Sequence, residues 1–109
     1  MKNKQNFWNE LKPFSSEKYS GISLAELVTV GILKLNQSKL ETNFENITVI
    51  LHKLFPDKFS LTYFPEYPDT IRVDITIRVH CKERGLVKGN RPKGFVLTGQ
   101  GQILAEKAL

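Results

Sequence analysis

The chain has 109 residues, of which 40% are hydrophobic and 25% are charged. This length and composition predict one globular domain and exclude disordered and collagen-like proteins. No apolar run approaches the roughly 20 residues of a membrane span, and the N-terminal residues lack the apolar core of a secretory signal. We therefore expect a cytoplasmic protein without membrane contact. The single cysteine, Cys81, excludes an internal disulfide and a multi-cysteine zinc site, and we expect it to be a small buried hydrophobe.

The net charge of +5 is distributed unevenly along the chain. Residues 1–69 carry eight Lys/Arg and eight Asp/Glu, whereas residues 70–109 carry eight Lys/Arg and three Asp/Glu. A segregated basic surface attracts polyanions, because each neutralised phosphate releases condensed counterions. The pattern predicts nucleic-acid contact by the C-terminal third; a solvated basic face without a partner is the alternative.

Residues 1–21 are predicted to form an N-terminal arm. A short helix over Asn6–Lys12 would place Phe7, Trp8, Leu11 and Phe14 on one face, and that face needs a cover.

Two core helices follow the arm. Ser23 and Glu26 have the spacing of a capping box, and apolar residues at helical spacing predict a helix over about residues 24–35. A second capping box, Thr42 to Glu45, begins a helix that ends at Pro56. Residues 56–69 contain three prolines, which predicts a packed, ordered loop.

Residues 70–84 fit two structures. Ile71, Val73, Ile75, Ile77 and Val79 alternate with polar residues, as in a half-buried strand. An N-cap at residue 69, a charged last turn at residues 82–84 and a glycine at 85 favour a helix instead. A strand of eleven residues would also be long. We expect the helix, and the strand remains the alternative.

The C-terminal residues predict a hairpin and a last helix. Residues 86–88 and 95–97 are short strands around a turn-rich loop, and Thr98 caps the final helix. The predicted fold is mainly α with a small β-hairpin (α+β), and its domain spans residues 22–109.

The order of helix, helix, helix, basic hairpin and helix resembles the winged helix-turn-helix superfamily. The resemblance rests on residues 82–87, KERGLV, and residues 95–106, FVLTGQGQILAE, which are similar to the helix end and the wing exit of MarR-like and PadR-like regulators. The long segment 56–69 departs from that pattern.

The resemblance implies a double-stranded DNA partner, with the third helix in the major groove and the hairpin, or wing, on the backbone or minor groove. Lysine and arginine can contact phosphates and read guanine. The implied DNA-binding residues of a transcriptional regulator or DNA-reading module are Arg72, Arg78, Lys82, Lys88, Arg91 and Lys93.

One face of the third helix favours an alternative, a winged helix that binds protein. If Val73 and Ile77 face the core, the β-branched residues between them point outward, where a DNA-reading surface seldom has aliphatic side chains. The sequence leaves open a homodimer, cover by the arm, or a monomer in which the 56–69 loop covers this face. The expected partner interface comprises Phe7, Trp8, Leu11, Ile71, Ile75 and Val79.

No catalytic pattern is evident, so we expect a protein that is not an enzyme and has no cofactor or metal. His52 and His80 lack partners in the sequence and are expected to be structural or surface residues. The pair Gly99 and Gly101 is too close to the C-terminus to open a dinucleotide-binding unit, and Leu104 replaces its third glycine.

Overall fold

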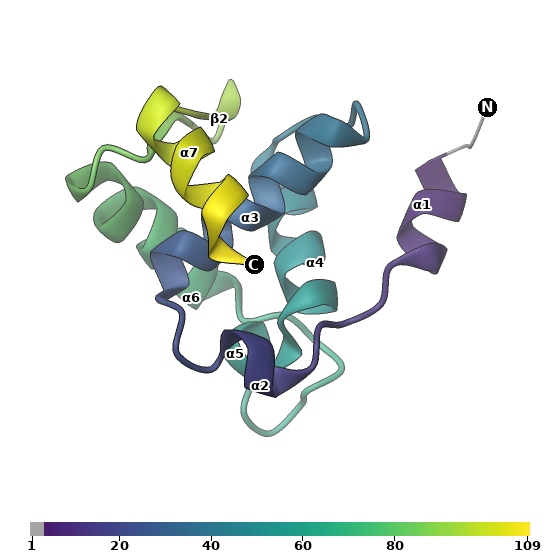
Figure 1. Cartoon of the computed structure of the whole chain (residues 1–109). Coiled ribbons are helices and arrows are strands. Elements are labelled where there is room, and N and C mark those ends of the chain that lie inside the picture. Colours follow the sequence, from purple (N-terminus) through teal and green to yellow (C-terminus); the bar gives the residue numbers. More distant parts are fainter. Residues whose placement is uncertain (1–3) are drawn as a thin grey trace.

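The computed structural model describes residues 4–109, which form a mainly helical fold with one two-stranded antiparallel sheet (Figure 1). The helical elements are α1 (Lys4–Glu10), α2 (Ser16–Tyr19), α3 (Leu24–Gln37), α4 (Phe44–Leu54), α5 (Pro56–Phe59), α6 (Thr70–Ile75), the π-helical η1 (Thr76–Cys81) and α7 (Gly99–Ala108). The strands are β1 (Val87–Asn90) and β2 (Gly94–Leu97). No helix in this part of the chain has the length and apolarity needed to cross a membrane.

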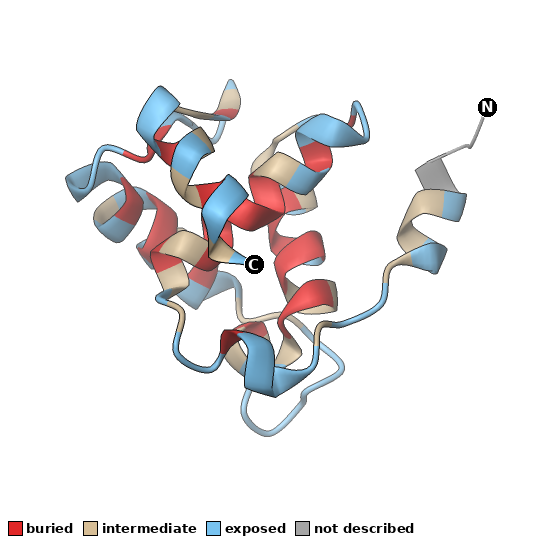
Figure 2. Ribbon diagram, in the orientation of Figure 1, coloured by how far each residue is buried: buried red, intermediate tan, exposed pale blue. Residues whose placement is uncertain are grey.

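Helix α3 is the centre of the core, where it packs against α4, η1 and α7. Its first turn is capped as expected, because the Ser23 hydroxyl accepts a hydrogen bond from the Glu26 amide at 3.2 Å. Leu27, Ile32 and Leu35 are fully buried, and the buried residues gather where the central helices meet (Figure 2). The helix predicted at residues 24–35 is confirmed and continues to Gln37.

Helix α4 is capped by a different residue from the one the sequence suggested. The Asn43 side chain accepts from the Asn46 amide at 2.7 Å, whereas the Thr42 hydroxyl donates to the carbonyl of Phe95 in the hairpin. Thr42 therefore ties the sheet to the helical core, and its backbone carbonyl also accepts from the Phe95 amide at 2.9 Å. The expected stop is confirmed: α4 ends at Leu54, and Pro56 begins the short helix α5.

Residues 70–83 are helical, so the strand alternative is wrong. Asp69 Oδ1 accepts from the Arg72 amide at 3.0 Å, and Gly85, with a φ of 67°, ends the helix in the left-handed conformation that glycine favours. Val73 and Ile77 are buried. An α-helix has about 3.6 residues per turn, so side chains four residues apart do not point in the same direction. The wider π-helical turns of η1 compensate for part of this rotation and suit the four-residue spacing of the buried side chains.

Cys81 is buried, as predicted, and its Sγ lies 3.7 Å from the Ala25 carbonyl oxygen. Burial raises the pKa of the thiol to about 12, although the positive charge of Arg84 acts in the opposite direction.

This raised pKa predicts alkaline destabilisation. The buried neutral thiol makes its full contribution to the stability of the folded protein below its ordinary pKa of 9.0. This contribution is lost as the pH rises toward 12. Urea unfolding at pH 7 and pH 10.5 should show a larger loss for the wild-type chain than for Cys81→Ala. The expected difference is on the order of 1.4 kcal/mol per pKa unit crossed. Equal losses in both proteins would contradict it.

The hairpin pairs Val87 with Leu97 and Asn90 with Gly94. Gly89 in β1 has a φ of 119°, and a Cβ atom there would lie 2.1 Å from the Gly94 carbonyl oxygen, so this position admits only glycine. Thr98 caps α7 as expected by accepting from the Gly101 amide at 3.0 Å.

Gly101 has a packing role. A Cβ atom on Gly101 would lie 2.1 Å from the carbonyl oxygen of Leu86, so this glycine lets α7 approach the chain next to β1. The close packing of α7 on Leu86 therefore accounts for the glycine at position 101.

The 56–69 segment is ordered but not packed throughout, which corrects the expectation. Phe59 in α5 is fully buried, whereas every residue from Leu61 to Tyr67 is exposed. Backbone hydrogen bonds close the segment at its base, so its exposed tip does not contribute to the core.

The arm forms helix α1 two residues earlier than predicted, followed by α2. Phe7, Trp8 and Leu11 are half-buried against the core. Phe14 stacks on Phe55 at 5.6 Å between ring centroids. The apolar face of the arm is therefore partly covered by the core of its own chain.

Candidate nucleic-acid interface

A small groove lies between the third helix (α6 and η1) and the hairpin. Its volume is about 140 Å³. The residues that line it are Asp74, Ile77, Arg78, Lys82, Gly89, Asn90, Arg91 and Phe95. The fold thus brings Arg78 and Lys82 of the helix together with Arg91 of the hairpin turn.

Asp74 lies in the middle of these cations. Its Oδ2 is 3.3 Å from Nε of Arg78, one helical turn later, and its Oδ1 is 3.6 Å from Nη2 of Arg91. The three side chains are partly exposed, so water screens both ion pairs. The carboxylate neutralises part of the positive charge and holds two guanidinium groups beside each other.

Arg91 joins three parts of the fold. Besides Asp74 on α6, its guanidinium carbon lies 3.9 Å from the centroid of the Phe44 ring, the first residue of α4. A cation over an aromatic face is attracted by the ring quadrupole. Arg91 therefore fixes the hairpin turn against both helices.

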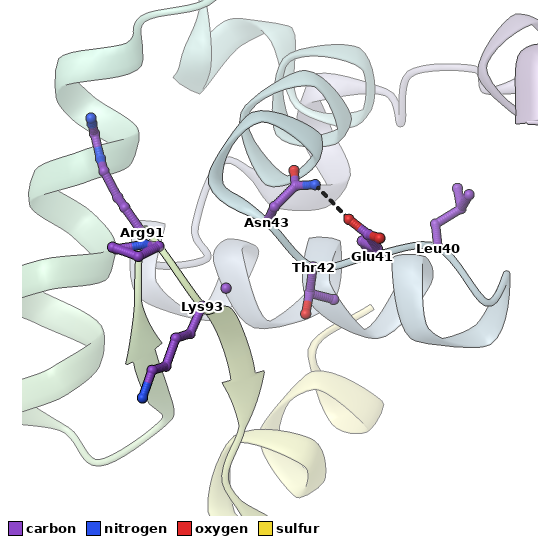
Figure 3. Close-up of a pocket in the computed structure, with 8 residues that line it drawn as sticks. Leu40, Glu41, Thr42, Asn43, Arg91 and Lys93 are labelled. Atoms are coloured by element: carbon purple, nitrogen blue, oxygen red, sulfur yellow. Dashed lines mark hydrogen bonds between the residues drawn. The ribbon is translucent and has the colours of Figure 1, made fainter.

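A second, open hollow of about 460 Å³ adjoins the hairpin turn on its other side. Residues Leu40–Asn43 line one side, and residues 91–94 line the other. Figure 3 shows Arg91 and Lys93 on the hairpin turn, with Asn43 and Glu41 across the hollow joined by a hydrogen bond of 3.3 Å. The hollow is thus partly acidic on the side of α4, and the Lys93 side chain points away from Glu41 and Asn43 in this view.

Three lysines complete the basic surface. Lys82, Lys88 and Lys93 are exposed, and none forms an ion pair within residues 4–109. Lysines without a carboxylate partner are available to a polyanion without breaking an internal contact.

Arg72 lies apart from this group. Its Nε is 3.8 Å from Oδ2 of Asp69, and its Nη1 donates to the carbonyl oxygen of Lys58 at 3.1 Å. It therefore faces the 56–69 segment, and the structure does not bring it together with the hairpin.

Sequence reasoning did not identify three residues that shape the basic surface. Asp74 precedes Arg78 by four positions, and this helix spacing is a signal for the first ion pair. The ion pair between Asp74 and Arg91 and the contact of Arg91 with the Phe44 ring join distant segments, so no local pattern indicates them. Arg84 reaches Ser23 Oγ at 3.1 Å and Glu26 Oε1 at 3.9 Å, which ties the end of the third helix to the start of α3.

Comparison of the chain with protein-family models, curated proteins and solved structures gave no match. In the described part of the chain, no group of three His, Cys, Asp or Glu residues is placed to hold a metal ion. The two histidines lie outside the groove: His80 is exposed, and His52 Nε2 lies 2.9 Å from the Pro65 carbonyl oxygen.

Two of the three aliphatic residues on the outward face of the third helix are exposed within this chain. Ile71 is 71% exposed, Ile75 is 41% exposed and Val79 is half-buried. The 56–69 segment therefore does not cover this face, and neither does the arm, which packs at Phe55. The two alternatives in which the arm or the 56–69 loop covers this face are therefore wrong.

Proposed function

We propose that this chain is a DNA-binding protein with a winged-helix arrangement, acting as a transcriptional regulator or as the DNA-reading module of a larger system. The third helix would enter the major groove of double-stranded DNA, and the β1–β2 hairpin would contact the backbone beside it. The role is binding, without a catalytic step.

One observation carries the proposal: basic residues from two separate elements line a single groove. Arg78 and Lys82 come from the third helix and Arg91 from the hairpin turn, with Lys88 and Lys93 exposed on the same hairpin. The helix carries side chains that can reach base edges, and the hairpin carries side chains that can reach phosphates. Arg72 is not included, because its guanidinium group is engaged elsewhere.

Asp74 should restrain the affinity for DNA. Replacing it with asparagine removes the negative charge beside Arg78 and Arg91 and frees both for phosphates. One additional phosphate contact steepens the salt dependence by about 0.9 and raises affinity roughly eightfold at about 0.1 M salt. Fluorescence anisotropy with a labelled duplex at several salt concentrations measures both quantities.

The matched control for this variant is Glu106→Gln. It makes the same change of charge on α7, where Glu106 contacts Gln102 rather than the groove. The control should leave DNA affinity within about twofold of wild type. An Asp74→Asn protein that binds DNA no better than this control would contradict the assigned role of Asp74.

The second candidate function is protein binding through the aliphatic face of the third helix. The exposure of Ile71 and Ile75 favours it, because exposed apolar patches mark interaction sites. The two functions respond differently to salt: DNA binding weakens steeply as salt is added, whereas an apolar contact does not.

A further inference from the structure

The tip of the 56–69 segment is an exposed aromatic surface. Residues 61–67, hereafter the aromatic loop, carry Tyr63, Phe64 and Tyr67, which are 88%, 60% and 58% exposed. Leu61 beside them is 38% exposed. Large aromatic side chains are usually buried, and they are enriched at protein interfaces when they lie at the surface.

The loop holds these side chains on an ordered backbone. The Leu61 amide donates to the Tyr67 carbonyl at 2.9 Å, and the Tyr67 amide donates to the Phe64 carbonyl at 2.9 Å. A β-bridge joins Ser60 to Pro68, and His52 anchors the Pro65 carbonyl. A preorganised loop loses less conformational entropy when a partner binds.

The exposed rings supply about half of the area that a standard interface needs. The exposed fractions of the three rings correspond to roughly 300–500 Å², if an aromatic side chain contributes about 150–250 Å². Leu61 adds to this surface, and neighbouring residues would supply the rest of the roughly 800 Å² per partner of a standard interface.

The charge around the loop favours a second copy of this chain over nucleic acid. Residues 57–72 contain three acidic and two basic side chains, although the whole chain carries +5. This region is thus nearly neutral and contains both signs, so two copies can meet on it without the repulsion that their basic surfaces would cause. Figure 1 shows the loop and the hairpin at opposite ends of the molecule, which leaves the hairpin free.

We propose that the aromatic loop is the centre of an isologous homodimer interface. It goes beyond both candidate functions, and it does not depend on DNA binding. The same patch on both subunits is the commonest arrangement of soluble oligomers.

Sedimentation equilibrium from 1 to 200 µM tests the interface. The wild-type chain should show twice its 12.5 kDa mass at the upper concentrations, and the double variant Tyr63→Ser/Phe64→Ser should weaken dimerisation at least 100-fold, as expected for central aromatic contacts. Ile103→Ser, which removes a 55% exposed side chain from α7, should dimerise like the wild type.

Both variants change exposed side chains, and thermal melting monitored by circular dichroism verifies their folding. For the double variant, the melt is compared with that of the wild type diluted to its monomeric range. A wild-type chain that remains monomeric at 200 µM would overturn the proposal and assign the surface to another protein. A double variant that dimerises like the wild type would also overturn it. The DNA-binding proposal fails separately: a dimer without DNA affinity contradicts that function alone, and a monomer that binds DNA contradicts the interface alone.

Discussion

Replacing Lys88, Arg91 and Lys93 by alanine lowers the affinity for double-stranded DNA by roughly 100- to 1,000-fold at about 0.1 M salt. Each phosphate that the variant no longer neutralises reduces the salt slope by about 0.9, so three of them flatten it by roughly 2.7. The decrease should be similar for all DNA sequences, since the hairpin is assigned to the backbone. Anisotropy titrations with two unrelated duplexes at several salt concentrations measure the affinity and the slope.

The control for the wing variant is Lys12→Ala/Lys34→Ala/Lys107→Ala. It lowers the net charge from +5 to +2, as the wing variant does, but its residues lie on the N-terminal arm, α3 and α7. Its affinity should fall much less. Because Arg91 also contacts Asp74 and Phe44, the melting temperature of the wing variant must be compared with that of the wild type. A folded wing variant that binds like this control would exclude the hairpin from the interface.

Thr76→Pro should unfold the domain or leave it only marginally stable. Thr76 is 1% exposed in the middle of the third helix, and its amide donates to the carbonyls of Arg72 and Val73. Proline has no amide hydrogen, and its ring collides with the carbonyl four residues earlier. The cost is about 3 kcal/mol or more, out of a total stability of about 5–15 kcal/mol. Thermal denaturation followed by circular dichroism measures the destabilisation.

Thr70→Pro is the matched control, since it makes the same substitution in the same helix. Thr70 is the first helical residue, where proline fits the backbone and interrupts no hydrogen bond within the helix. Its melting temperature should remain within a few degrees of wild type. Equal melting temperatures for the two proline variants would contradict the helix-interior position of residue 76.

Local patterns were sufficient to predict most of the secondary structure. Capping side chains and apolar spacing located α3 and α7, apolar spacing located α4, and Gly85 located the C-terminal end of the third helix. Residues 70–84 showed alternation typical of a strand, yet they form a helix. A spacing of two contains a spacing of four, so Val73 and Ile77 line one face of the helix, and the residues between them remain outside.

The arrangement of the groove could not be predicted in the same way, because it depends on distant segments. Arg78 and Lys82 were identified from the sequence, but the pairing of Asp74 with Arg91 requires the hairpin to fold against α6. Charge alone groups Arg72 with the other cations, and its contacts with Asp69 and Lys58 separate it from them.

The aromatic loop shows a similar limit. The three prolines of residues 56–69 predicted a packed, ordered loop, but only part of this segment is packed. Backbone hydrogen bonds within the loop and the short helix α5 place Phe59 in the core and Tyr63 in solvent. Composition gives no information on which aromatic residues of a loop face inward.

The most direct test of the central claim is a gel-shift titration of the wild-type chain on mixed genomic DNA at 50 and 200 mM salt. With three to five phosphate contacts, the affinity should fall roughly 50- to 500-fold between the two concentrations. An absence of binding at 50 mM salt, or an affinity that does not change with salt, would contradict the assignment of the basic groove and hairpin to nucleic acid.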